Sequence, residues 1–343
     1  MMQQSREHPG SRGVTRRGVL LGAALLAASR PAAGVGAQTP VASPAASPVA
    51  GWTFSDDRGI TVSLPQAPQR VVAEINAAAA LWDYGIRPVG VFGPQHRADG
   101  EVDPRVGHVD LGLVEDLGEV WGEVDIEGLL ALGADLVVAP TWDPPELFYL
   151  TTDGEAALGG HVPAIGIQTA KVSLDKSIQR FAELAGALGA DLDSPDNEAA
   201  RVAYATALED LKAAIASNPD LAVLFVAGDD ASFYVAQPDD MADLILLKDL
   251  GLNILSGGES DYWETLSWED VQQYPADLIL VDAREGSYSL EDFAKVPTWG
   301  SVPAAQAGQV AVWNAEPVYS YAGYAPELQR LADLIRDARG DVA

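Results

Sequence analysis

Aromatic side chains gather at the ends of several predicted strands in this sequence of 343 residues. Indole and phenol rings combine rigid apolar area with a hydrogen-bonding group, which suits them to bind a bulky amphipathic ligand. In open α/β sheets, ligands bind just beyond the carboxyl ends of the strands. We therefore predict a ligand site at these strand ends. The residues predicted to line it are Trp121, Trp142, Tyr262, Trp263, Arg284, Tyr319 and Tyr321, together with Arg97 from a long polar segment.

The sequence holds none of the common catalytic or phosphate-binding signatures. G-x-x-x-x-G-K-[ST], G-x-S-x-G and H-E-x-x-H are all absent, and no G-x-G-x-x-G follows a predicted strand. We therefore predict a binding protein with no catalytic residues rather than an enzyme. The alternative from another functional class is an exported hydrolase that uses a cleft carboxylate such as Asp143 or Glu146.

The chain has no Cys and four His. The absence of Cys excludes disulfides, thiolate metal sites, a Cys nucleophile and a lipid-modified cysteine after a signal peptide. No two His stand at the spacing of metal ligands, so neither a metal site nor a cofactor is predicted. The alternative is a divalent-metal site in which a folded loop brings His96 and His108 together.

The charge of the chain is strongly negative, with 50 acidic residues against 21 Lys and Arg and a net charge of −29. A surface of this charge repels nucleic acid phosphates and anionic lipids, so neither is an expected partner. The excess of acids is most simply explained as an adaptation of the surface to solubility or salt, with an acidic binding face as the alternative.

Two similar sequence units must position the candidate ligand residues. The unit DIEGLLALGADLVVAP begins at Asp125, SWEDVQQYPADLILVD begins at Ser267, and the two align without a gap. Each is typical of an N-cap, a short helix and a buried strand, so Trp142 and Arg284 follow equivalent strands. Each half of the chain shows the order β-α-β-α-β, which predicts parallel sheets with helices on their faces.

A long helix is predicted between the two halves. Ser194 is a suitable N-cap and Pro195 a suitable first helical residue, and Pro219 marks the end of the helical segment. The predicted fold is therefore α/β: two αβ lobes with mostly parallel sheets, joined by one long α-helix, with a ligand cleft between the lobes. The predicted boundaries are 51–170 for the N-terminal lobe, 171–219 for the helical linker and 220–343 for the C-terminal lobe.

The first fifty residues are typical of an export signal and a spacer. Arg16 and Arg17 precede a short apolar run and resemble a twin-arginine signal, and small residues favour cleavage after Ala37. An uncleaved N-terminal anchor is the alternative. Residues 1–37 are thus predicted to be the signal peptide and 38–50 a Pro/Ser/Ala-rich linker, which places the folded lobes outside the cytoplasm, in a periplasm or at the cell surface.

From about residue 51 to the end, the chain resembles the extracytoplasmic substrate-binding proteins of ABC importers for ferric siderophores, haem and cobalamin. The resemblance is strongest in PQRVVAEINAAAALWDYGIRPVGVFG, EDLGEVWGEVDIEGLLALGADLVVA and LSWEDVQQYPADLILV. It implies two αβ lobes joined by one long helix, with the ligand bound between them and no bond made or broken. It also implies an ABC permease with its ATPase as the partner, and we expect the binding protein to be a monomer.

The resemblance implies roles for particular residues. Glu127 and Glu269 match the glutamates that dock on permease arginines, although each is also a first-turn acid that stabilises its helix dipole. The acidic body and the few Arg at strand ends favour a neutral or cationic hydroxamate-type Fe(III)-siderophore complex as the ligand. Cobalamin and haem are the alternatives within the family, followed by a divalent metal.

Overall fold

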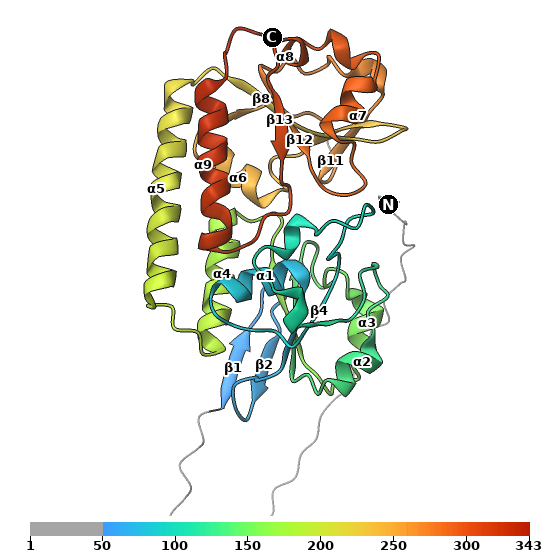
Figure 1. The fold of residues 1–343 in the computed structure, drawn as a ribbon, viewed down its shortest axis with the longest axis vertical. Helices are drawn as coiled ribbons and strands as arrows, with labels where there is room; N and C mark the ends of the chain where they lie inside the picture. The colour runs from blue at the N-terminus through green and yellow to red at the C-terminus, as the bar shows by residue number, and fades with distance from the viewer. Residues whose placement is uncertain (1–50, 259) are drawn as a thin grey trace, which may run out of the picture. The chain divides into compact units, whose positions relative to one another are not determined.

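The computed structural model describes residues 51–343 except residue 259, and these residues belong to one unit, Ala50–Ala343 (Figure 1). The predicted signal peptide and Pro/Ser/Ala-rich linker lie outside the described residues. Within the described residues, no helix combines the length and apolar character that a membrane span requires.

The N-terminal lobe is built on a five-stranded sheet in which all neighbouring strands pair in parallel. Its two central strands are buried along their whole length, as expected for parallel strands covered on both faces. In sheet order the strands are β5 (Glu115–Asp116), β4 (Gly90–Phe92), β3 (Val71–Glu74), β6 (Leu136–Thr141) and β7 (Ala164–Gln168). The helices of this lobe are α1 (Ile75–Asp83), α2 (Ile126–Ala131) and α3 (Thr151–Ala157).

The C-terminal lobe has a mixed six-stranded sheet. Its parallel strands, in sheet order, are β10 (Asn253–Ile254), β8 (Ala222–Gly228), β12 (Leu278–Asp282) and β13 (Val310–Trp313). Two antiparallel strands extend the same sheet from β8, namely β9 (Phe233–Ala236) and β11 (Trp263–Leu266). The helices are α6 (Ala242–Asp249), α7 (Leu290–Lys295), α8 (Pro303–Gln306) and α9 (Tyr321–Asp337).

The structure confirms the predicted fold class and adds two features that the sequence analysis did not predict. The order β-α-β-α-β predicted for the second half omits the antiparallel strands β9 and β11. A two-stranded hairpin of β1 (Trp52–Ser55) and β2 (Thr61–Leu64) precedes the first sheet.

Two helices form the connection between the sheets, α4 (Leu174–Ala187) and α5 (Pro195–Ser217). The 23-residue α5 has the predicted start, because the Ser194 side chain accepts a hydrogen bond from Asn197 N. Figure 1 shows α9 lying beside α5, and these two helices make extensive contact. One cluster of buried hydrophobic residues runs from α1 through α4 and α5 to α9 and β8, so the two lobes share a core.

The shared core predicts that α5 is essential for stability. Leu211 on α5 is fully buried, whereas the neighbouring Lys212 is exposed and pairs with Glu209 on the same helix. Leu211→Ala should lower the free energy of unfolding by about 2–5 kcal/mol because it leaves a cavity. Lys212→Ala should change it by about 0.5 kcal/mol or less. Chemical denaturation measures both, and equal effects would contradict the packing role of α5.

Candidate functional site

Five charged side chains meet where the carboxyl ends of the two sheets face one another. Asp103 and Arg105 come from the N-terminal lobe, on the 3-10 turn η1 (Pro104–Val106). Asp282 ends β12, Arg284 follows it, and Glu316 lies three residues beyond β13. We call these five residues the interlobe cluster.

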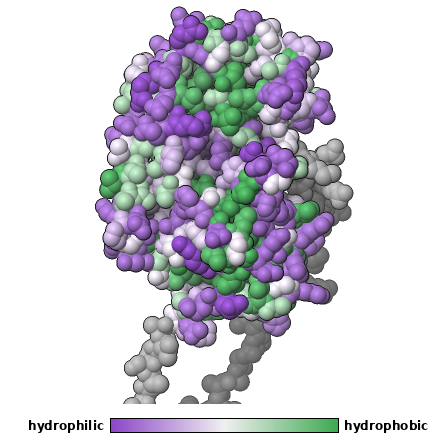
Figure 2. Space-filling view, in the orientation of Figure 1, coloured by the Kyte–Doolittle hydropathy of each residue, from purple (hydrophilic) through white to green (hydrophobic). Residues whose placement is uncertain are grey.

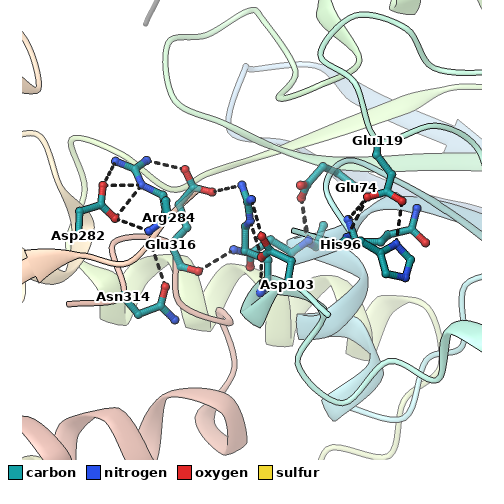
Figure 3. Close-up of polar contacts among 12 residues, drawn as sticks. Glu74, His96, Asp103, Glu119, Asp282, Arg284, Asn314 and Glu316 are labelled. Atoms are coloured by element: carbon teal, nitrogen blue, oxygen red, sulfur yellow. Dashed lines mark hydrogen bonds and ion pairs between the residues drawn. The ribbon is translucent and has the colours of Figure 1, made fainter. Parts of the chain in front are cut away.

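The Glu316 carboxylate lies between two guanidinium groups (Figure 3). Arg284 Nη1 donates to Glu316 Oε1 at 2.7 Å, and Arg105 Nη1 donates to Glu316 Oε2 at 3.1 Å. Each arginine is also held by an acid of its own lobe. Arg105 Nε and Nη2 both lie 2.8 Å from Asp103 oxygens, and Arg284 Nη2 lies 2.7 Å from Asp282 Oδ2. Glu316 therefore links the lobes through one carboxylate.

The interlobe cluster carries more negative than positive charge. Burial alone would raise the pKa of Glu316, but Arg284 and Arg105 outweigh burial and lower it below its usual range. Burial also opposes ionisation of Asp103, and the hydrogen bond from Arg105 brings its pKa below the usual value. With Asp282 bonded to Arg284, three carboxylates thus face two guanidinium groups.

A buried glutamate stands beside this cluster at the carboxyl end of β3. Glu74 Oε2 caps α1 by accepting hydrogen bonds from Asn76 N at 2.9 Å and Ala77 N at 3.3 Å. Its Oε1 has no hydrogen-bond partner among the described residues. Burial raises the pKa of Glu74 to about 8, with Arg105 opposing and Glu316 adding to the rise. Glu74 is therefore mostly protonated near neutral pH.

Aromatic rings from both lobes lie next to the interlobe cluster. Trp142 stacks on Phe148 with ring centroids 5.2 Å apart, and Tyr262 of the other lobe lies 5.2 Å from Trp142. Trp121 extends the group through Phe148 at 5.1 Å. The Arg284 guanidinium is 6.0 Å from the Trp142 ring and 5.7 Å from the Trp263 ring. We call Trp121, Trp142, Phe148, Tyr262 and Trp263 the aromatic wall.

The structure brings five of the predicted ligand residues together, namely Trp121, Trp142, Tyr262, Trp263 and Arg284, whereas Tyr319, Tyr321 and Arg97 make other contacts. Tyr319 is buried, stacks on Phe181 and lines a small interior cavity with Trp142. Tyr321 is the first residue of α9 and contacts Tyr84 and Tyr204, which are not part of the aromatic wall. Arg97 is half-buried, its backbone N donates to Glu101 O, and its charge helps to lower the pKa of Asp103 in the interlobe cluster.

Several residues of the site were missed by the sequence analysis. Asp103 and Arg105 lie in the polar segment that contains Arg97, where Asp103 followed by Pro104 signals the start of a helical turn. Glu316 follows a predicted strand end, but the strand-end rule was applied mainly to aromatic residues. Glu74 also ends a predicted strand, and the rule would have found it.

The residues named for the alternative divalent-metal site and for the alternative hydrolase make other contacts. His96 Nδ1 lies 2.8 Å from Glu119 Oε1, and His108 Nδ1 lies 2.8 Å from Asp83 Oδ1, so each ring pairs with a different acid. Within the described part of the chain, no group of three or more His, Cys, Asp or Glu residues could hold a metal ion. Asp143 is exposed and pairs with Lys171 Nζ at 3.1 Å. Glu146 is exposed as well.

The two candidate docking glutamates are exposed, one on each lobe. Glu127 lies in the first turn of α2, which Asp125 caps by accepting from Gly128 N at 2.8 Å. Glu269 lies in the 3-10 turn η3 (Trp268–Asp270), which Ser267 caps by accepting from Glu269 N at 3.2 Å. The repeated sequence unit thus presents one exposed carboxylate at the same position in each lobe.

Known proteins share this architecture. The family described as "Periplasmic binding protein" matches residues 119–317. The structure of DesE, a ferric-siderophore receptor protein from Streptomyces coelicolor, matches with a TM-score of 0.80 and 34% identity, over 84% of this chain and 99% of that chain. FhuD from Vibrio cholerae, solved with Fe3+-Desferal bound, matches in fold with a TM-score of 0.55 and 21% identity, over 80% of this chain and 98% of that chain. The Fe(3+)-citrate-binding protein YfmC of Bacillus subtilis (strain 168) is 23% identical over 258 residues, covering 74% of this chain and 76% of YfmC.

The chain therefore belongs to the periplasmic binding protein family, as its resemblance implied. Members of this family are extracytoplasmic binding proteins rather than enzymes, and in general they work with ABC permeases. The fold, with its two sheets and the long helix α5, agrees with this assignment.

The protonated state of Glu74 predicts how stability depends on pH. The unfolded carboxyl ionises above about pH 4.5, whereas the folded one holds its proton to about pH 8, so rising pH favours unfolding between these values. Glu74→Gln keeps an oxygen to cap α1 and removes the titration. From about pH 5.5 to about pH 7.5 the wild type should lose about 2 kcal/mol more of its free energy of unfolding than the variant. Denaturation curves at both pH values test this, and parallel losses would contradict it.

Proposed function

We propose that this protein captures a neutral or cationic hydroxamate-type ferric siderophore between its lobes and delivers it to an ABC permease. The observation that carries the proposal is the interlobe cluster, whose two guanidinium groups are already matched by three carboxylates. The aromatic wall beside the cluster supplies the apolar surface that a bulky chelate needs.

The charge of the site favours one class of chelate. An anionic chelate would have to compete with Asp103, Asp282 and Glu316 for the arginines and would add to a negative excess in a poorly solvated place. A neutral hydroxamate complex adds no charge, and a cationic one reduces the excess. Both also present apolar methylene and ring surfaces to the aromatic wall.

Similarity to two iron-chelate receptors supports an iron chelate as the ligand. DesE, with 34% identity over nearly its whole length, is a ferric-siderophore receptor, and YfmC is a Fe(3+)-citrate-binding protein.

We also propose that the chain is exported through a twin-arginine signal, is cleaved after Ala37 and carries a spacer at 38–50. The folded part would have lobes at 51–170 and 220–343, joined by a helical linker at 171–219. It would act as a monomer without a resident cofactor. Hydrophilic residues cover much of the face shown in Figure 2, and this surface, together with the excess of acidic residues in the sequence, agrees with a secreted protein.

Ligand binding can be followed by tryptophan fluorescence. Ferrioxamine B and ferrichrome should quench the emission in a saturable way, while the iron-free ligands should not. Trp142→Ala should weaken binding about tenfold or more because it removes the central ring of the aromatic wall. Trp82→Ala is the matched control, since this ring packs under Arg87 and should leave affinity unchanged.

Other outcomes would overturn the ligand assignment. A co-purifying chromophore with the absorption of haem or a corrinoid, together with no response to ferric hydroxamates, would select the other ligands of the family. Conversion of any ligand to a product would show the exported hydrolase instead, with Asp143 and Glu146 as the first residues to test.

Delivery to the permease should depend on the two exposed glutamates. The double variant Glu127→Ala, Glu269→Ala should bind the chelate with unchanged affinity. It should abolish uptake of radiolabelled iron by cells that rely on this receptor, because both lobes lose their docking carboxylate. The control, Glu183→Ala with Glu209→Ala, removes exposed acids of the connecting helices and should leave uptake intact. Reduced chelate affinity in the first double variant would refute the docking role.

A further inference from the structure

The carboxylate of Glu316 lies between the guanidinium groups of Arg105 and Arg284. It takes one N–H of Arg105 from the N-terminal lobe and one of Arg284 from its own lobe (Figure 3). The Nε and Nη2 atoms of both guanidinium groups donate to Asp103 and Asp282. An anionic ligand at the interlobe cluster would therefore compete with Glu316 for these arginines.

The backbone around Glu316 is fixed, so this placement is built into the fold. Glu316 N donates to Asn314 Oδ1 at 3.3 Å, and Asn76 of the other lobe donates to the Glu316 carbonyl oxygen at 3.3 Å. The preceding Trp313 is buried, with its indole N–H donating to Asp243 Oδ2 at 2.6 Å. These contacts aim a side chain that is only 6% exposed toward the junction rather than toward solvent.

We propose that Glu316 determines the charge selectivity of the site: it excludes anionic ferric chelates by holding Arg105 and Arg284, and it attracts cationic ones. This inference rests on the proposed function and adds a named selectivity residue to it. The physical reason is that charges interact strongly where water is excluded, so one fixed carboxylate distinguishes ligands of opposite charge.

The test replaces the carboxylate by a neutral amide of the same shape. Glu316→Gln keeps one oxygen as an acceptor for an arginine and removes the charge. Binding is measured for three probes: ferrioxamine B, which carries a free ammonium, ferrichrome, which is neutral, and ferric enterobactin, which is anionic. We expect the affinity for ferric enterobactin to rise about tenfold or more and that for ferrioxamine B to fall about tenfold, while ferrichrome changes less than about threefold.

Opposite changes for the two charged probes separate selectivity from damage to the fold. A variant that was merely destabilised would bind every probe more weakly, and its thermal unfolding would reveal the defect. Glu155→Gln is the matched control, because it removes the charge of another glutamate that accepts hydrogen bonds from an arginine, Arg58, outside the interlobe cluster. We expect it to shift the affinities for the charged probes by less than about threefold.

Each outcome decides the proposal. Parallel weakening, no change in selectivity, or an equal shift in Glu155→Gln overturns the role of Glu316 while leaving the proposed function intact, since the wild type still binds ferric hydroxamates. If neither the wild type nor Glu316→Gln binds any of the three probes, the proposed function fails and this inference fails with it. Gain of ferric enterobactin binding with loss of ferrioxamine B binding supports the proposal.

Discussion

Buried charged side chains need partners of opposite charge. At the junction of the two lobes, some of these partners come from the other lobe. A guanidinium group has a rigid set of N–H donors, and an acid of the same lobe satisfies only part of each set here. The Nη1 atoms of Arg105 and Arg284 remain, and the single carboxylate of Glu316 accepts from both. The carboxyl ends of the two sheets therefore meet at one carboxylate that pairs with an arginine from each lobe.

The shared hydrophobic core limits how far the lobes can separate around this ion pair. The cluster of buried residues that joins α1, α4, α5 and α9 continues into the second sheet, and each square ångström of apolar surface exposed by opening costs about 25 cal/mol. A wide hinge motion is thus expensive, whereas rearrangement of charged side chains at the junction is less so. Under the proposed function, a ligand would therefore enter mainly by competing for Arg105 and Arg284 and by adjustment of the aromatic wall.

The sequence predicted the elements that depend on local rules. Ser194 and Pro195 start α5 because a cap and a fixed φ act within a few residues, and the apolar runs of β6 and β12 identify buried parallel strands. Strand ends could be located in the same way, which is why Trp142, Trp263 and Arg284 were identified as candidate residues and do lie together.

The parts that the sequence did not predict depend on distant partners. Strands β9 and β11 are short, and they pair Ala236 with Trp263 across an intervening helix. The periodicity of the local sequence therefore does not reveal their pairing. The hydrogen bond from Arg105 to Glu316 spans 211 residues, and any of 50 acids could have been the partner. Tyr321 was expected near the ligand because it was assigned to a strand end, but it begins α9 and packs against Tyr84 and Tyr204.

Two neighbouring carboxyl groups at the junction have opposite protonation states, and this division sets the charge that a ligand meets. Glu316 keeps its charge because both arginines stabilise it, and that negative charge then helps to raise the pKa of the buried Glu74. If both carboxyls were ionised, the junction would hold four carboxylates against two guanidinium groups, with one carboxylate oxygen of Glu74 lacking a partner among the described residues. Pairing Glu316 and protonating Glu74 avoids that state. The protonation states of these two residues therefore leave the interlobe cluster with one excess negative charge near neutral pH. This excess is the electrostatic basis of the proposed preference for chelates that are neutral or positively charged.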